Sequence, residues 1–200
     1  VISPLQSLMK DQIDNLEQKG ITSAVTINGL LNPIERSKAI ERVRDGSACI
    51  LYIAPESLRS KTIEKLLIDR NLVRFVIDEA HCFSTWGQDF RVDYLYIGEF
   101  IKHIQREKAL KRPIPVSCFT ATAKPNVIED IKAYFKHKLD FDMKVYKTPI
   151  SRKNLSYKVY NVAKEEKYAL LRNLIEQEDT PTIVYAITQK MVEDIYNRLK

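Results

Sequence analysis

Two adjacent carboxylates follow an apolar, strand-like run near the middle of the chain. Residues 73–77 read Val-Arg-Phe-Val-Ile and lead directly into Asp78-Glu79-Ala80-His81. In open parallel sheets the ligand lies at the carboxyl ends of the strands, so both carboxylates stand where a ligand would bind. Phosphoryl transfer uses such a pair in two roles. One carboxylate holds Mg²⁺, usually through water, and the other positions or deprotonates the attacking water.

Two other interpretations of this run are weaker. Glu79 and His81 are two residues apart, which is not the spacing of a helical His-Glu-x-x-His zinc site. A four-residue match to Asp-Glu-Ala-His can also be incidental, but the five-residue apolar strand in front of it favours a functional interpretation. The run is therefore a candidate catalytic site.

An aromatic loop follows the two carboxylates. Residues 82–91 read Cys-Phe-Ser-Thr-Trp-Gly-Gln-Asp-Phe-Arg and contain the only tryptophan, Trp86. Large aromatic side chains in a polar loop with a glycine are poor core candidates. Bases of single-stranded nucleic acid stack on such rings, at about 1–3 kcal/mol per base. The alternative is a loop folded back on its own hydrophobic cluster.

A third strand end carries small hydroxyl side chains. Residues 117–123 read Ser-Cys-Phe-Thr-Ala-Thr-Ala. Thr120 and Thr122 could hydrogen-bond a neighbouring carboxylate or histidine, or they could cap the helix expected to start near Pro125. On the residues alone, capping is the favoured interpretation.

The elements that must position these residues alternate between strand-like and helix-like runs. Strands are expected at 24–27, 49–53, 72–77, 116–119 and 143–146, and residues 1–3 read as the end of another. Helices are expected at 5–19, 33–44, 60–69, 94–108 and 125–136. Asn32, Pro33 and Gly46 supply capping signals for the second of these helices. Strand-like runs at 156–162 and 182–185 and helical runs at 165–178 and 190–200 continue the theme.

This alternation predicts an α/β fold with a mainly parallel sheet. The strands are continuous apolar runs, as expected when helices cover both faces of the sheet. Arg152-Lys153-Asn154 is the expected linker. It separates a first domain at 1–150 from a segment at 151–200 that is too short for a complete doubly wound domain.

The amino-acid composition limits further which classes of protein the chain can belong to. The chain has 200 residues and is 44% hydrophobic. It contains only 5 glycines, which is 2.5% of its residues, where roughly 7% is usual. No two glycines are spaced for the phosphate cradles GxGxxG or GxxxxGK[ST]. Cys49, Cys82 and Cys118 are widely spaced and are expected to be reduced thiols. The longest uncharged apolar runs are strand-sized, so no membrane partner is expected.

The net charge of +6 is unevenly distributed. Residues 1–100 carry 12 Lys/Arg and 14 Asp/Glu, whereas residues 101–200 carry 20 and 12. The excess lies in two basic stretches: Lys102, Arg106, Lys108, Lys111 and Arg112, and then Lys132, Lys136, Lys138, Lys144, Lys147, Arg152 and Lys153. For each stretch alone, the favoured interpretation is a solvent-exposed helix or loop face. The alternative, which makes a more specific functional claim, is a nucleic-acid-binding surface.

Taken together, these segments resemble the RecQ family of DNA helicases, within superfamily 2, over essentially the whole chain. The matching segments are Ser3-Pro4-Leu5-Gln6-Ser7-Leu8-Met9-Lys10-Asp11-Gln12 (like motif Ia), Tyr52-Ile53-Ala54-Pro55-Glu56-Ser57-Leu58, Asp78-Glu79-Ala80-His81 (motif II), Trp86-Gly87-Gln88-Asp89-Phe90-Arg91, Thr120-Ala121-Thr122-Ala123 (motif III) and Arg152-Lys153-Asn154-Leu155. The aromatic-rich loop is the most specific of them, because it separates this family from RNA-directed DEAH helicases.

The resemblance implies a RecA-like helicase domain, followed by an incomplete second RecA-like domain. It also implies roles at the nucleotide. Asp78 would coordinate the Mg²⁺ of Mg-ATP, and Glu79 would activate water. His81, Thr120 and Thr122 would couple the nucleotide state to DNA. ATP and Mg²⁺ are the implied cofactors.

Further roles are implied at the DNA. Trp86, Phe90 and Arg91 would sense single-stranded DNA and trigger hydrolysis. The side chains expected on or near the strand track are Ser3, Pro4 and Lys10. Single-stranded and forked duplex DNA are the implied partners, together with single-stranded-DNA-binding protein and other repair proteins.

The implied activity of the parent protein is 3′→5′ unwinding of duplex DNA, driven by Mg-ATP hydrolysis, in replication, recombination or repair. The parent would be cytoplasmic and nucleoid-associated in a bacterium, or nuclear in a eukaryote. The 200-residue piece is expected to be monomeric.

Some departures from the family pattern limit what is expected of this piece. The phosphate-binding loop precedes motif Ia in the family and would precede Val1, while the arginine contacts to the γ-phosphate would follow Lys200. Residues 184–190 also depart from the usual motif IV. The chain alone is therefore expected to be inactive. A different hypothesis is a non-catalytic single-stranded nucleic-acid-binding module, and a third is a DEAH RNA helicase fragment.

Overall fold

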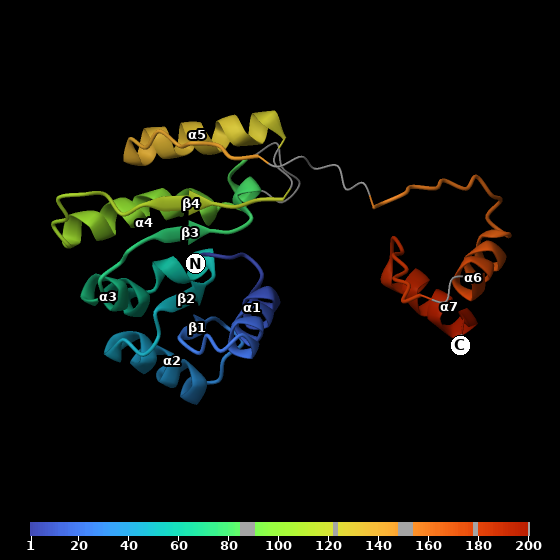
Figure 1. Ribbon diagram of the computed structural model, residues 1–200, viewed down its shortest axis with the longest axis horizontal. Helices are drawn as coiled ribbons and strands as arrows, with labels where there is room; N and C mark the ends of the chain where they lie inside the picture. Colours follow the sequence, from blue (N-terminus) through green and yellow to red (C-terminus); the bar gives the residue numbers. More distant parts are fainter. Residues whose placement is uncertain (85–90, 122–123, 148–153, 178–179, 200) are drawn as a thin grey trace. The chain divides into compact units, whose positions relative to one another are not determined.

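The computed structural model describes residues 1–84, 91–121, 124–147, 154–177 and 180–199. The chain divides into two compact units, Val1–Tyr146 and Lys147–Lys200, and each is described by itself (Figure 1). Some residues named in the sequence analysis lie outside the described ranges: Trp86, Phe90, Thr122, Arg152 and Lys153. Their predicted roles stay predictions.

The first unit is built on parallel strands. β1 (Ala24–Ile27) pairs with β2 (Ile50–Ile53), and β3 (Phe75–Ile77) pairs with β4 (Val116–Cys118), both in parallel. Ile2 joins the two pairs through parallel bridges to Ile53 and Ile77. The strand end predicted at residues 1–3 therefore lies between β2 and β3, and the predicted parallel sheet is confirmed.

Helices cover the two faces of this sheet unequally (Figure 1). α1 (Gln6–Gln18) packs through Met9 against Ile50 and Tyr52 on one face. The main core lies on the other face and includes Leu51 and Ile53. It also takes side chains from α2 (Pro33–Asp45), α3 (Lys61–Asp69), α4 (Tyr94–Glu107) and α5 (Pro125–Leu139). Successive side chains of β2 alternate between the clusters because a strand has a side-chain period of two.

Local signals set the ends of the helices. Asn32 caps α2 by accepting hydrogen bonds from the N–H groups of Ile34 and Glu35, and the Glu35 carboxylate accepts one in return from the Asn32 N–H. This reciprocal arrangement is a capping box. Gly46 ends the helix at φ 89°, a left-handed conformation that favours glycine. Two short 3₁₀ helices, η1 (Pro55–Arg59) and η2 (Ala80–Phe83), follow β2 and β3 and were not predicted.

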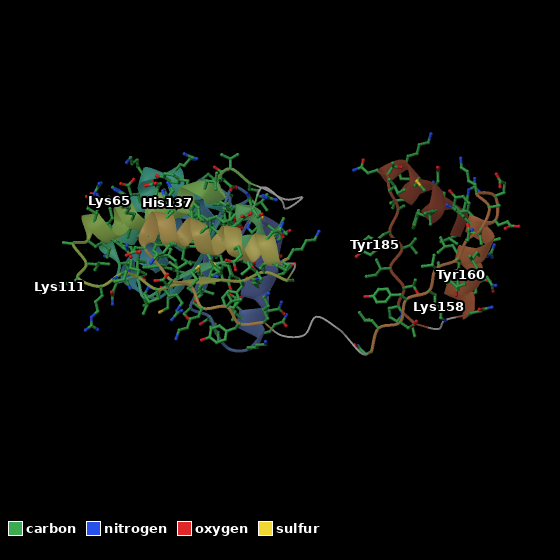
Figure 2. All side chains as sticks on the ribbon, turned by 90° about the horizontal axis from the view of Figure 1, so that it is seen from above. Lys65, Lys111, His137, Lys158, Tyr160 and Tyr185 are labelled. Carbon is green, nitrogen blue, oxygen red and sulfur yellow. The ribbon has the colours of Figure 1, made fainter. Side chains whose placement is uncertain are left out.

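The second unit contains α6 (Lys167–Gln177) and α7 (Gln189–Leu199). The strands predicted at 143–146, 156–162 and 182–185 are wrong, because these residues form no ladder. Residues 156–162 and 182–185 carry exposed apolar side chains, among them Val159 at 95% and Tyr185 at 89%. Tyr185 is labelled in Figure 2. An apolar run becomes a strand only when a neighbouring strand accepts its hydrogen bonds, and the described residues supply none here.

Across the described ranges, no helix has the length and apolarity that crossing a membrane requires.

Candidate functional site

The carboxyl ends of β3 and β4 lie side by side. Ile77 is the register partner of Cys118, so the residues that follow each strand reach the same edge of the sheet. The pairing continues past the strands, because the Phe119 N–H donates to the Ile77 carbonyl at 2.8 Å and the Ala80 N–H donates to the Phe119 carbonyl at 2.9 Å. The segment beginning at Asp78 is thereby held against the segment that contains Thr120.

Asp78 is held by three neighbouring residues. Its Oδ1 accepts from the Glu79 N–H at 2.9 Å, and its Oδ2 accepts from the Ser3 hydroxyl at 3.3 Å. The Tyr94 hydroxyl donates to its backbone carbonyl at 2.9 Å. Asp78 is half-buried, so a fixed carboxylate lies at the edge of the sheet with part of its surface exposed to solvent.

Glu79 adopts a left-handed backbone conformation, with φ 48° and ψ 45°. This conformation is uncommon for a residue with a Cβ, and such residues cluster at functional sites. The Glu79 Oε2 lies 3.1 Å from the His81 Nδ1. The turn into η2 therefore places the glutamate and the histidine of Asp-Glu-Ala-His against each other.

His81 also contacts Thr120 from the neighbouring strand end. Its Nδ1 lies 3.1 Å from the Thr120 Oγ1. The N-cap of α5 is Lys124 rather than Thr120, and the Lys124 side chain makes no capping hydrogen bond. The favoured capping interpretation is therefore wrong for Thr120, and the alternative, a hydrogen bond to histidine, is confirmed.

Oxygen ligands at this edge fit a hard divalent cation. Within the described ranges, no group of three or more His, Cys, Asp or Glu side chains could hold a metal. Mg²⁺ is commonly bound by one or two carboxylates together with substrate phosphates and waters. Asp78, whose two oxygens accept hydrogen bonds from Ser3 and Glu79, supplies one such carboxylate.

Arg91 contacts the segment that precedes α1. Its guanidinium donates to the Pro4 carbonyl at 3.3 Å, and its backbone N–H donates to the Cys82 carbonyl at 3.2 Å. Of the residues predicted on the strand track, Ser3 and Pro4 are buried and Lys10 is exposed on α1. DNA contact by these residues stays a prediction, and the structure shows that Ser3 and Pro4 contact Asp78 and Arg91.

Lysines of the two basic stretches make local contacts. Lys108 donates to the carbonyls of Ile68 and Arg70, and Lys111 is exposed in the turn after α4 (Figure 2). This turn precedes the amino end of β4, so it lies at the edge of the sheet opposite Asp78. Three lysines of α5 form ion pairs, in the contacts Lys132–Glu129, Lys136–Asp140 and Lys138–Glu99. These contacts favour the interpretation of a solvated face.

Two contacts at the site were missed by reasoning from the sequence. Tyr94 is fully buried at the start of α4, where burial raises the pKa of its phenol, and its hydroxyl reaches Asp78. The buried Ser84 hydroxyl donates to the Asp130 Oδ2 at 2.5 Å, which joins the end of η2 to α5. A tyrosine on an apolar helix face is ordinarily interpreted as core packing, so no sequence signal pointed to the first contact.

Comparison with known proteins identifies the family to which the chain belongs. The family described as DEAD/DEAH box helicase matches residues 1–131. The probable ATP-dependent DNA helicase RecS of Bacillus subtilis is 35% identical across the whole chain, which covers 38% of that relative. The ATP-dependent DNA helicases RecQ of Bacillus subtilis and Haemophilus influenzae are 36% and 31% identical, again across the whole chain, and it covers 32% and 30% of them.

Solved structures show the same fold. The DUF1998 helicase MrfA bound to DNA and AMPPNP matches all of this chain with a TM-score of 0.65 and 19% identity, over 28% of that protein. Mycobacterium smegmatis helicase Lhr bound to single-stranded DNA and AMP-PNP matches 99% of the chain with a TM-score of 0.61 and 16% identity, over 27% of that protein. The chain spans about a third of the length of the curated relatives named above. By its family match and by these relatives, the chain belongs to the DEAD/DEAH box helicases, as a member of the RecQ type.

Proposed function

We propose that the protein carrying this chain is an ATP-dependent DNA helicase. It would move 3′→5′ and couple Mg-ATP hydrolysis to the unwinding of duplex DNA in replication, recombination or repair. One observation carries the proposal: the Asp78 carboxylate and the Glu79–His81–Thr120 contact meet at one edge of the sheet. The RecS and RecQ relatives, named as ATP-dependent DNA helicases, support it.

The two carboxylates have different surroundings that suit different roles. Asp78 accepts hydrogen bonds on both oxygens, which fixes its orientation for holding Mg²⁺. When bound, Mg²⁺ would neutralise charge that develops on the transferred phosphoryl group. Glu79 would position the attacking water and accept its proton. Its contact with His81 holds the carboxylate at the end of a left-handed turn.

Coupling to DNA would run through the segments after β3 and β4. His81 contacts both the water-activating Glu79 and Thr120. A displacement of Thr120 would therefore move His81 and, through it, the Glu79 carboxylate, while the strands of the sheet stay in place. The predicted DNA sensors Trp86, Phe90 and Arg91 follow in the chain, and Arg91 is hydrogen-bonded back to Cys82 in η2.

The test is ATP hydrolysis by the complete gene product with and without single-stranded DNA. Wild-type protein is expected to be stimulated by DNA. Glu79→Gln is expected to lower the stimulated rate by about 10²-fold or more, because general-base catalysis contributes on that order. Glu129→Gln, which alters an exposed carboxylate on α5, is the matched control and should hydrolyse ATP like wild type.

Three outcomes would contradict parts of the proposal. A Glu79→Gln variant as fast as wild type would reject Glu79 as the base. Salt-dependent binding of single-stranded DNA without any ATP hydrolysis would favour a non-catalytic binding module. Equal stimulation by matched RNA would point to an RNA helicase. Duplexes with a 3′ or a 5′ single-stranded tail would test the polarity.

A further inference from the structure

We propose that Tyr94 is a positioning residue that, together with Ser3, fixes Asp78 and links it to Arg91. This inference rests on the proposed function, in which Asp78 holds the Mg²⁺ of Mg-ATP and Arg91 senses DNA. It assigns a second connection between the two sites, separate from the contact between His81 and Thr120.

Tyr94 is placed to hold the backbone of Asp78. It is fully buried, and its ring packs edge-on against Phe83 with the ring centroids 5.2 Å apart. Its hydroxyl donates to the Asp78 carbonyl at 2.9 Å. Burial raises the pKa of the phenol, so the hydroxyl stays protonated and remains a donor. A buried donor of this kind restrains its acceptor, because the buried hydroxyl cannot readily exchange its partner for water.

The backbone of Tyr94 also meets Arg91. The Tyr94 N–H donates to the Arg91 carbonyl at 3.0 Å, in the turn that starts α4. Tyr94 is therefore hydrogen-bonded both to Arg91, the predicted DNA sensor, and to Asp78, the predicted metal ligand. A displacement of Arg91 would act directly on the helix start from which the phenol extends.

Ser3 provides a parallel route to the same aspartate. The Arg91 guanidinium donates to the Pro4 carbonyl, and the adjacent Ser3 hydroxyl donates to the Asp78 Oδ2. Ser3 is fully buried, and its own N–H is held by the Ile53 carbonyl at 3.1 Å. The first route holds the Asp78 backbone and the second holds its carboxylate, so together they set both the position and the orientation of the group.

The test compares two tyrosines whose phenol hydroxyls each donate a hydrogen bond to a backbone carbonyl in the same unit. Tyr94→Phe removes the hydrogen bond to Asp78 and keeps the ring. Tyr134→Phe is the matched control, because the Tyr134 hydroxyl donates to the Leu95 carbonyl at 2.9 Å and accepts from the Gly98 N–H at 2.8 Å, between α4 and α5. Burial raises the pKa of Tyr134 to about 12, so it is also a protonated phenol.

The main readout is the Mg²⁺ concentration at which a non-hydrolysable ATP analogue binds half-maximally to the complete gene product, measured by calorimetry. Tyr94→Phe is expected to raise this concentration about three- to tenfold, the range that corresponds to one net hydrogen bond. Ser3→Ala should shift it in the same direction. Tyr134→Phe should stay within about twofold of wild type. The DNA concentration that gives half-maximal stimulation of ATP hydrolysis should rise in Tyr94→Phe and stay unchanged in Tyr134→Phe.

The outcomes separate this inference from the proposed function. Wild-type protein that binds the analogue without any dependence on Mg²⁺ would reject the proposed function and the inference together. Mg²⁺-dependent wild-type binding, with Tyr94→Phe and Ser3→Ala both within twofold of wild type, would reject the inference alone. Should Tyr94→Phe fold poorly, Ser3→Ala decides the matter, because it alters the second route without touching α4.

Discussion

His81 and Thr120 come from the ends of two neighbouring strands, and their side chains meet. The Nδ1 of His81 lies 3.1 Å from the Oγ1 of Thr120 and also 3.1 Å from the Oε2 of Glu79. One imidazole therefore joins the proposed water-activating carboxylate to the segment that leads into α5. The contact exists because β3 and β4 are parallel and in register up to Ile77 and Cys118.

Removing the Thr120 hydroxyl should weaken the coupling of ATP hydrolysis to DNA. Thr120→Val keeps the shape of the side chain and loses the hydrogen bond to His81. The ratio of ATPase rates with and without single-stranded DNA is expected to fall about three- to tenfold, as for the loss of one net hydrogen bond. Ser117→Ala on β4, whose hydroxyl contacts Arg74, is the control. An unchanged ratio in Thr120→Val would count against the proposed coupling.

The crossing of α4 and α5 leaves no room for a side chain at Gly98. A Cβ there would lie 2.6 Å from the Tyr134 hydroxyl and 3.0 Å from the Lys138 Cβ. Gly98→Ala is therefore expected to lower the free energy of unfolding by about 1–3 kcal/mol, although alanine is the better helix former. Urea denaturation measures the change. The loss should be smaller in a Tyr134→Phe background, and a gain in stability would contradict the close approach.

Ala109 occupies a position that favours glycine. It follows the C-cap of α4 at φ 46°, and the N–H groups of Ala109 and Leu110 donate to the carbonyls of Arg106 and Gln105. These bonds form a Schellman motif with alanine in the left-handed position. Ala109→Gly should raise the free energy of unfolding by about 0.5–1 kcal/mol, because the left-handed strain is relieved. Ala133→Gly, in the middle of α5, should instead lower it by about 1 kcal/mol. Equal effects of the two changes would refute this explanation.

The three cysteines should differ in reactivity. Cys49 is exposed, Cys82 is buried, and burial raises the pKa of the Cys118 thiol to about 12. Since the thiolate is the reactive form, iodoacetamide at pH 8 should modify Cys49 alone in the native protein and all three after unfolding. At pH 9 the reaction at Cys118 should still be slow, because burial raises the pKa of its thiol to about 12. Peptide mass spectrometry measures each site, and rapid native labelling of Cys118 would contradict its burial.

Short-range signals in the sequence determined most of the elements. The Asn32–Glu35 capping box, the left-handed Gly46 and the apolar runs of β1 to β4 were readable because each depends on residues close together in the chain. The Asp78–Glu79 pair was found for the same reason, because it follows its strand directly. The strands expected in the second unit were wrong because a strand depends on a distant partner.

Only the tertiary structure decided which side chains meet at the site. Ser3 and Asp78 are 75 positions apart in the sequence, His81 and Thr120 are 39 apart, and Tyr94 and Asp78 are 16 apart. Composition and local spacing identify donors and acceptors but not their pairing. The register of the parallel strands and the start of α4 set these pairs, since hydrogen bonds require heavy atoms within about 3 Å and a suitable angle. The sequence by itself therefore determined the chemical groups available, and the packing of the sheet determined which of them act together.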